Sequence, residues 1–134
     1  MKIYRPVSLI LCIVFAVVGL LFLCATDRVL IFFNILSSPL GMLPSPVWDL
    51  GYYPLLAGGY MYLVTLLAFF MYRHPENRSF PLLLAHGKLA TSILSLALFI
   101  FHEQYLIYIA NFIIDGIIGV VVMLFFLNMK KKKT

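Results

Sequence analysis

The sequence predicts an all-α integral membrane protein: a bundle of four transmembrane helices with a short interfacial or re-entrant helix in the first outer loop. Three observations predict it, namely the composition, four apolar stretches of membrane-spanning length, and basic residues that gather on one side. Of the 134 residues, 63% are hydrophobic and 11% are charged, and the mean hydropathy is +1.04. Soluble domains are about 45–50% apolar and about 25% charged. A soluble globular enzyme and a disordered chain are therefore both excluded.

Four stretches are long enough to cross a membrane. A helix needs about 20 apolar residues to cross a hydrocarbon core of about 30 Å, so the chain forms a single membrane domain over residues 1–134. Pro6, Pro54 and Pro81 stand near the starts of three stretches, where a proline loses no helical hydrogen bond. Ser79 is the expected N-cap of the third. The predicted spans are approximately 6–25, 53–72, 80–101 and 105–128.

The first apolar run is predicted to be a retained span and not a cleaved signal peptide. It covers 19 residues, from Val7 to Ala25, whereas the apolar region of a signal peptide has about 7–15. The residues at the C-terminal end of this run lack the small-x-small pattern of a signal-peptide cleavage site. Cys12 and Cys24 lie in this run about 18 Å apart along one helix, which is too far for a disulfide.

Basic residues indicate the orientation. They occur before the first span (Lys2, Arg5), between the second and third (residues 73–78), and in the lysine-rich tail 129–134, all on one side of a four-helix bundle. Arg28 is the only basic residue on the other side. Because positive charge marks the cytoplasmic side, both termini are predicted to be cytoplasmic, with a bacterial inner membrane as the expected location.

Aromatic residues and the lysine tail suit the same orientation. Rings prefer the membrane–water interface, and the sequence places Tyr4 and Tyr72 at the inner interface and Trp48, Tyr52, Tyr53 and Tyr105 at the outer one. The tail attracts anionic lipid by about 1 kcal/mol per basic residue. Membrane lipids are therefore expected partners, and nucleic acid is not, because the chain has no basic soluble domain.

The outer segment 26–52 is long for a loop and still apolar. Arg28 to Leu36 is predicted to form a short helix, capped by Thr26 or Asp27 and too short to cross. Turn-forming residues then interrupt regular structure: Ser37, Ser38, Pro39, Gly41, Pro44 and Pro46. The segment is expected to lie at the outer mouth of the bundle, either as a loop resting among headgroups or as a lid over a cavity.

Ionisable residues inside apolar spans are costly and mark candidate functional positions. Lys88 lies about 12 Å and Asp115 about 20 Å from the inner ends of their helices, an offset of about 8 Å. Helix tilt brings this offset within reach, although each side chain leans toward the N-terminus of its own helix, which separates the two groups. A direct ion pair, a bridged pair, and a Lys88 that snorkels away from a protonated or otherwise partnered Asp115 all remain open.

Each predicted helix carries one polar or small face. The faces are Ser8, Cys12, Ala16 and Gly19; Gly58, Tyr62 and Thr65; Lys88, Thr91, Ser92 and Ser95; and Tyr108, Asn111, Asp115 and Gly119. Such faces meet inside membrane bundles. The predicted intramembrane polar site is formed by Lys88, Asp115, Asn111, Thr91, Ser92, Ser95, Tyr62 and Tyr108. These residues either hold the helices together through interhelical hydrogen bonds or line a polar cavity with Asp115 and Lys88 at its base.

Catalytic and cofactor motifs are missing from the sequence. His86 and His102 lie about 24 Å apart on one helix, so they cannot hold a haem between facing helices. The chain has no Cys-x-x-Cys, His-Glu-x-x-His, Gly-x-Ser-x-Gly or phosphate-binding loop. We therefore expect no metal, no cofactor and no catalytic residue.

The layout of four helices, both termini inside and a long first outer loop resembles the DoxX-like group of small bacterial membrane proteins. The similarity is one of topology over most of the chain, and no shared motif transfers a site residue. The first functional hypothesis is a non-catalytic accessory or anchoring subunit of a membrane complex, with a protein partner or a second copy. The second is a transporter or carrier of a small molecule, lipid or ion around Asp115 and Lys88. The third is a membrane enzyme that acts on a lipid or quinone.

Overall fold

The computed structural model describes residues 3–47 and 53–131 and is helical in all its main elements. The sequence predictions for Lys2, Trp48, Tyr52 and the last two lysines lie outside the described residues. Four of the helices are long and apolar enough to cross a membrane, as predicted. The elements are α1 (Tyr4–Cys24), α2 (Thr26–Ser37), the 3-10 turn η1 (Ser38–Leu40), α3 (Tyr53–Arg73), α4 (Ser79–Phe101) and α5 (Leu106–Lys131).

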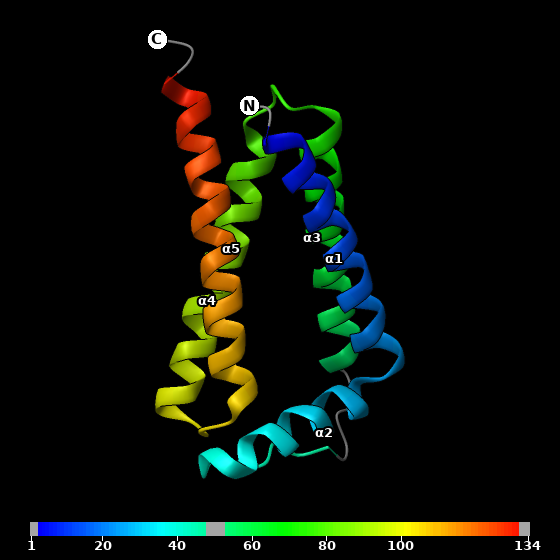
Figure 1. Ribbon diagram of the computed structural model, residues 1–134, viewed down its shortest axis with the longest axis vertical. Coiled ribbons are helices and arrows are strands. Elements are labelled where there is room, and N and C mark those ends of the chain that lie inside the picture. The colour runs from blue at the N-terminus through cyan, green and yellow to red at the C-terminus, as the bar shows by residue number, and fades with distance from the viewer. Residues whose placement is uncertain (1–2, 48–52, 132–134) are drawn as a thin grey trace.

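The four long helices form two antiparallel pairs. α1 packs along α3, and α4 packs along α5, with a smaller contact between α3 and α4 (Figure 1). α2 runs crosswise at the bottom of the view and contacts both α1 and α5. The start of α1 and the end of α5 lie together at the opposite end. We call the end with α2 the outer end and the other the inner end.

Glycines allow the close approach within each pair. A Cβ atom added at Gly58 of α3 would collide with Leu23 of α1. One added at Gly119 of α5 would lie 2.8 Å from Leu89 Cδ2 of α4. Small residues at helix contacts permit such close packing between apolar helices.

The buried core differs from the predicted face of α3. The structure buries Gly58, as predicted, but it leaves Tyr62 67% exposed and Thr65 half-buried. Tyr62 thus lies outside the buried face of α3, because the buried stripe runs beside it: Met61, Val64, Ala68 and Met71. Those residues pack against Tyr4, Phe15, Leu84, Ala85, Val122 and Met129 of the other long helices.

Helix ends also depart from the predictions. Ser79 is the first residue of α4 and not its cap, and its backbone N–H donates to Asn77 Oδ1 at 3.0 Å. α2 has no side-chain cap, because the Thr26 hydroxyl donates to the Phe22 carbonyl instead. α5 continues to Lys131, so the first part of the predicted tail is helical.

The outer segment folds back on α2. Asn34 binds the backbone of Ser45 from both sides: its Nδ2 donates to the Ser45 carbonyl at 2.9 Å, and its Oδ1 accepts the Ser45 N–H at 2.8 Å. Gly41, with φ of 65°, makes the left-handed turn that permits this return. Leu43 then pairs with Tyr105 in a parallel bridge. α2 and its return segment thus lie across the outer ends of both helix pairs.

Candidate functional site

A buried ion pair joins α4 to α5 near the middle of both helices. Lys88 Nζ lies 2.8 Å from Asp115 Oδ1. The two residues are only 3% and 4% exposed. Of the arrangements left open by the sequence, the structure shows the direct pair, and Lys88 does not extend to the inner end.

The pair can form because Lys88 and Asp115 lie at more similar depths along the bundle axis than their distances from the inner ends of the helices suggest. α4 and α5 meet at the turn around Glu103, fifteen residues after Lys88 and twelve before Asp115. The difference of three residues corresponds to an offset of about 4.5 Å, which the long lysine side chain covers. The sequence-based offset is larger because the inner ends of the two predicted spans, residues 80 and 128, lie 23 and 25 residues from Glu103 and are therefore not level.

Side chains from all four long helices meet at the Lys88 ammonium. The Phe15 ring of α1 has its centroid 4.7 Å from Nζ, and the Tyr60 ring of α3 has its centroid 5.2 Å away. Both distances are typical of cation–π contacts. On α4 itself, Thr91 donates its hydroxyl to Asp115 Oδ2 at 2.5 Å, and the Tyr60 hydroxyl lies 3.4 Å from Thr91 Oγ1.

Phe15 and Tyr60 were not recognised from the sequence. Tyr60 precedes Val64 and Ala68 by four and eight residues, a helical spacing that places it beside the buried stripe. That spacing identifies Tyr60 only once the structure has shown which stripe of α3 is buried. Phe15 lies on the predicted small face of α1, seven residues after Ser8 and four before Gly19, and this spacing could have identified it, since all three are buried.

More polar contacts continue between α4 and α5 toward the outer end. Ser92 donates to the Phe112 carbonyl at 2.7 Å, and Asn111 donates from Nδ2 to Ser95 Oγ at 2.6 Å. Gly116 leaves room for Ser92, since a Cβ there would lie 3.0 Å from its hydroxyl oxygen. The predicted site residues of α4 and α5 therefore all make hydrogen bonds between these two helices, except Tyr108.

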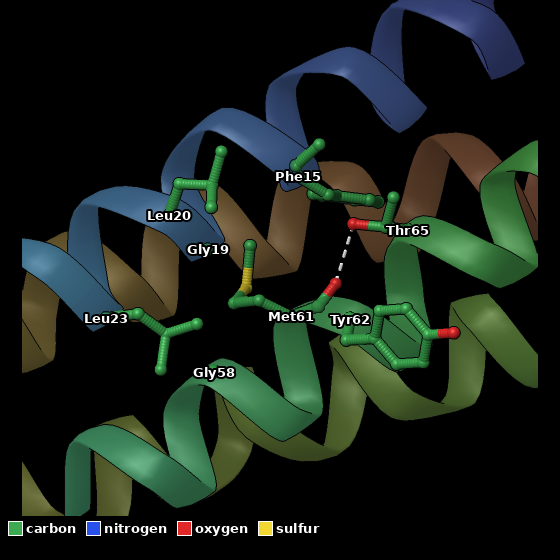
Figure 2. A pocket seen from close by; sticks show the side chains of 9 residues that line it. Phe15, Gly19, Leu20, Leu23, Gly58, Met61, Tyr62 and Thr65 are labelled. Atoms are coloured by element: carbon green, nitrogen blue, oxygen red, sulfur yellow. Dashed lines mark hydrogen bonds between the residues drawn. The ribbon is translucent and has the colours of Figure 1, made fainter.

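Two predicted site residues lie elsewhere. The Tyr108 ring packs against that of Tyr105, with centroids 5.4 Å apart, at the outer end of α5. Tyr62 borders an apolar groove between α1 and α3 with a volume of about 250 Å³ (Figure 2). Lys88 and Asp115 do not line this groove, and Thr65 at its edge donates its hydroxyl to the Met61 carbonyl at 2.7 Å.

The buried polar side chains of the cluster find their hydrogen-bond partners within the protein. Across residues 3–47 and 53–131, the Tyr4 hydroxyl is the one buried side-chain polar atom without a hydrogen-bond partner. In the same ranges, no three His, Cys, Asp or Glu side chains gather where they could hold a metal ion. The cluster is thus suited to holding helices together, because each of its own buried polar side chains already has an internal partner.

No protein-family model, curated protein or solved structure matches the chain. The resemblance to the DoxX-like group stays a prediction from topology.

The ring of Tyr60 is expected to stabilise Lys88 more than its hydroxyl does. Tyr60→Leu removes the cation–π contact and should lower the free energy of unfolding by about 1–2 kcal/mol, whereas Tyr60→Phe keeps the ring and should cost less. Unfolding in increasing mole fractions of SDS, followed by circular dichroism, measures both. Tyr62→Leu on the exposed face is the matched control. Equal losses for Tyr60→Leu and Tyr60→Phe would assign the effect to the hydroxyl.

Proposed function

We propose that this protein is a non-catalytic integral membrane protein that serves as an accessory or anchoring subunit of a larger membrane complex. The observation that carries the proposal is the closed ion pair of Lys88 and Asp115, whose groups are buried and partnered internally. A group that must bind a substrate or transfer a proton needs access to it, and these have none in this conformation. In this proposal the polar cluster stabilises the helix packing, and the residues that carry the function lie on the exposed surface of the helices.

Membrane embedding is part of this proposal. The four long apolar helices support it. The start of α1 and the end of α5 lie at the same end, the inner one. Arg5, Arg73 and Arg78 lie at that same end, which favours a cytoplasmic location for it. A bacterial inner membrane is the proposed setting.

One exposed face of α3 has the features of a surface that contacts a partner helix, which supports the proposal. Leu55, Gly59 and Tyr62 follow each other at helical spacing, and Leu55 and Tyr62 are 59% and 67% exposed. A Cβ at Gly59 would meet no atom within 4 Å, so its small size is not needed for packing within the chain. In Figure 2 the Tyr62 hydroxyl points away from Gly19 and Leu23. A glycine and a hydroxyl near the middle of a span are typical of helix–helix contacts in membranes.

Site-specific crosslinking tests the proposal. A photoreactive amino acid at position 59 or 62 is expected to capture one defined partner in the native membrane, either another protein or a second copy. The control position is Ile117 on α5, which is 61% exposed. Purification of the tagged chain in nanodiscs with mass spectrometry then identifies the partner. A lone monomer with no crosslink from position 59 or 62 would contradict the proposal.

A transporter or carrier is the second candidate. It is favoured by the position of Lys88 and Asp115 near the middle of their helices, where ionisable residues commonly mark transport pathways. In this case the ion pair would have to open during the cycle, with Phe15 and Tyr60 moving off the ammonium. The membrane enzyme remains a prediction that no specific contact favours.

A further inference from the structure

We propose that the inner end of the α1–α3 pair binds the phosphate of an anionic phospholipid, with Arg5 as the main contact and Tyr72 as its positioning residue. This inference rests on the membrane placement proposed above. It goes beyond the general attraction of a lysine-rich tail to anionic lipid, because it assigns a site to defined side chains on a different part of the molecule.

The geometry of Arg5 carries the inference. Its Cζ atom lies 5.3 Å from the centroid of the Tyr72 ring, so α3 holds the guanidinium of α1 in place. Stacking on a ring leaves the N–H groups at the guanidinium edge free to bind a phosphate. Arg73, the last residue of α3, adds a second exposed positive charge at the same end of this helix pair.

Neither arginine is neutralised within the described part of the chain. There, the Lys88–Asp115 contact is the one salt bridge formed. Asp27 and Glu103 lie at the outer end, and Glu76 is the acidic residue nearest in sequence to Arg73. The positive charge of Arg5 and Arg73 is thus available to an anion.

Arg78 has a different role, although it belongs to the same end. Its Nη2 donates to the Met129 carbonyl at 2.5 Å, and the residue is only half-buried. This bond ties the start of α4 to the last turns of α5. We therefore leave Arg78 out of the proposed site.

The surroundings favour a phospholipid over free phosphate. One helical turn deeper than Arg5, Leu9 is 38% exposed, and one turn deeper than Arg73, Phe69 is 41% exposed. Positive charge at the end of a span with exposed apolar side chains directly below matches an amphiphile that carries a phosphate above its acyl chains. Free phosphate would gain nothing from the apolar part.

Native mass spectrometry of the full-length chain tests the inference. The protein is released from mild detergent after incubation with phosphatidylglycerol or phosphatidylcholine, and the retained lipids are counted. We expect tighter binding of phosphatidylglycerol and about fivefold weaker binding after Arg5→Gln. Tyr72→Phe should keep the affinity, and Tyr72→Leu should lower it, because only the ring positions Arg5. Excess inorganic phosphate should not displace the lipid.

Arg28→Gln is the matched control, because Arg28 is an exposed arginine at the outer end. The lysine tail is unchanged in all variants, so its contribution cancels. Wild-type retention of phosphatidylglycerol in Arg5→Gln, an equal loss in Arg28→Gln, or displacement by inorganic phosphate would each overturn the site. If lipid selectivity fails while the chain stays in the membrane fraction and crosslinks through α3, the subunit proposal survives. A chain absent from the membrane fraction contradicts both.

Discussion

Replacing Asp115 with asparagine is expected to lower the free energy of unfolding by about 3–5 kcal/mol. The variant keeps the size of the side chain but removes the charge that lies 2.8 Å from Lys88 Nζ. A buried ammonium would then keep the Phe15 and Tyr60 rings and a neutral amide oxygen as partners, but no opposite charge. Unfolding in SDS, compared at equal protein and detergent concentrations, measures the loss.

A double variant separates the ion pair from general damage. Lys88→Met together with Asp115→Asn removes both charges and leaves an amide that can still accept the Thr91 hydroxyl. We expect it to be more stable than Asp115→Asn alone, because no unpaired charge remains. A double variant that loses the sum of the two single losses would show that the groups do not stabilise each other.

Asp115→Asn also distinguishes the two candidate functions. In an accessory subunit, any loss of function should follow the loss of folded protein, and the more stable double variant should restore assembly with the partner. In a transporter, both variants should be inactive even where folded protein is present at the wild-type amount. Function restored by the double variant would therefore contradict the transporter.

Replacing Gly119 with valine is the second large effect expected. A Cβ atom there would lie 2.8 Å from Leu89 Cδ2 and 3.2 Å from the Leu89 backbone nitrogen. Because backbone cannot move aside as a side chain can, α4 and α5 would have to separate. Overpacking of this kind costs about 1–3 kcal/mol, and separation would also lengthen the Lys88–Asp115 contact.

Gly59→Val is the matched control for Gly119→Val. It places the same residue in a long helix, at a position where an added Cβ meets no atom within 4 Å. SDS unfolding of the detergent-solubilised monomer should show a much smaller loss for Gly59→Val. Equal losses at the two positions would mean that valine itself, and not the α4–α5 contact, lowers the stability.

The four long helices could be predicted because their length and hydropathy depend on sequence alone. The polar stripe of α4 was also identifiable: Lys88, Ser92 and Ser95 follow helical spacing among apolar residues, and all three are buried. Polar side chains on an apolar helix find hydrogen-bond partners mainly on neighbouring helices, so their spacing indicates which face of the helix points inward.

The inward face of α3 could not be identified in the same way. Glycine, tyrosine and threonine occur on several of its sides, and apolar residues surround them. Tyr60 and Tyr62 differ by two positions, which places them on nearly opposite faces of a helix. Only the packing of α3 against α1 and α4 decides that Tyr60 faces Lys88 while Tyr62 faces outward.

The number of long helices, their antiparallel order and the concentration of positive charge at one end can be derived from the sequence, because they depend on local hydropathy and on the number of loops. The direct pairing of Lys88 with Asp115, and its enclosure by Phe15, Tyr60 and Thr91, could be learned only from the packed structure. That outcome depends on the relative level and rotation of four neighbouring helices. In chains this apolar, one side of a helix differs little from another in hydrophobicity, so packing and hydrogen bonding decide which side turns inward.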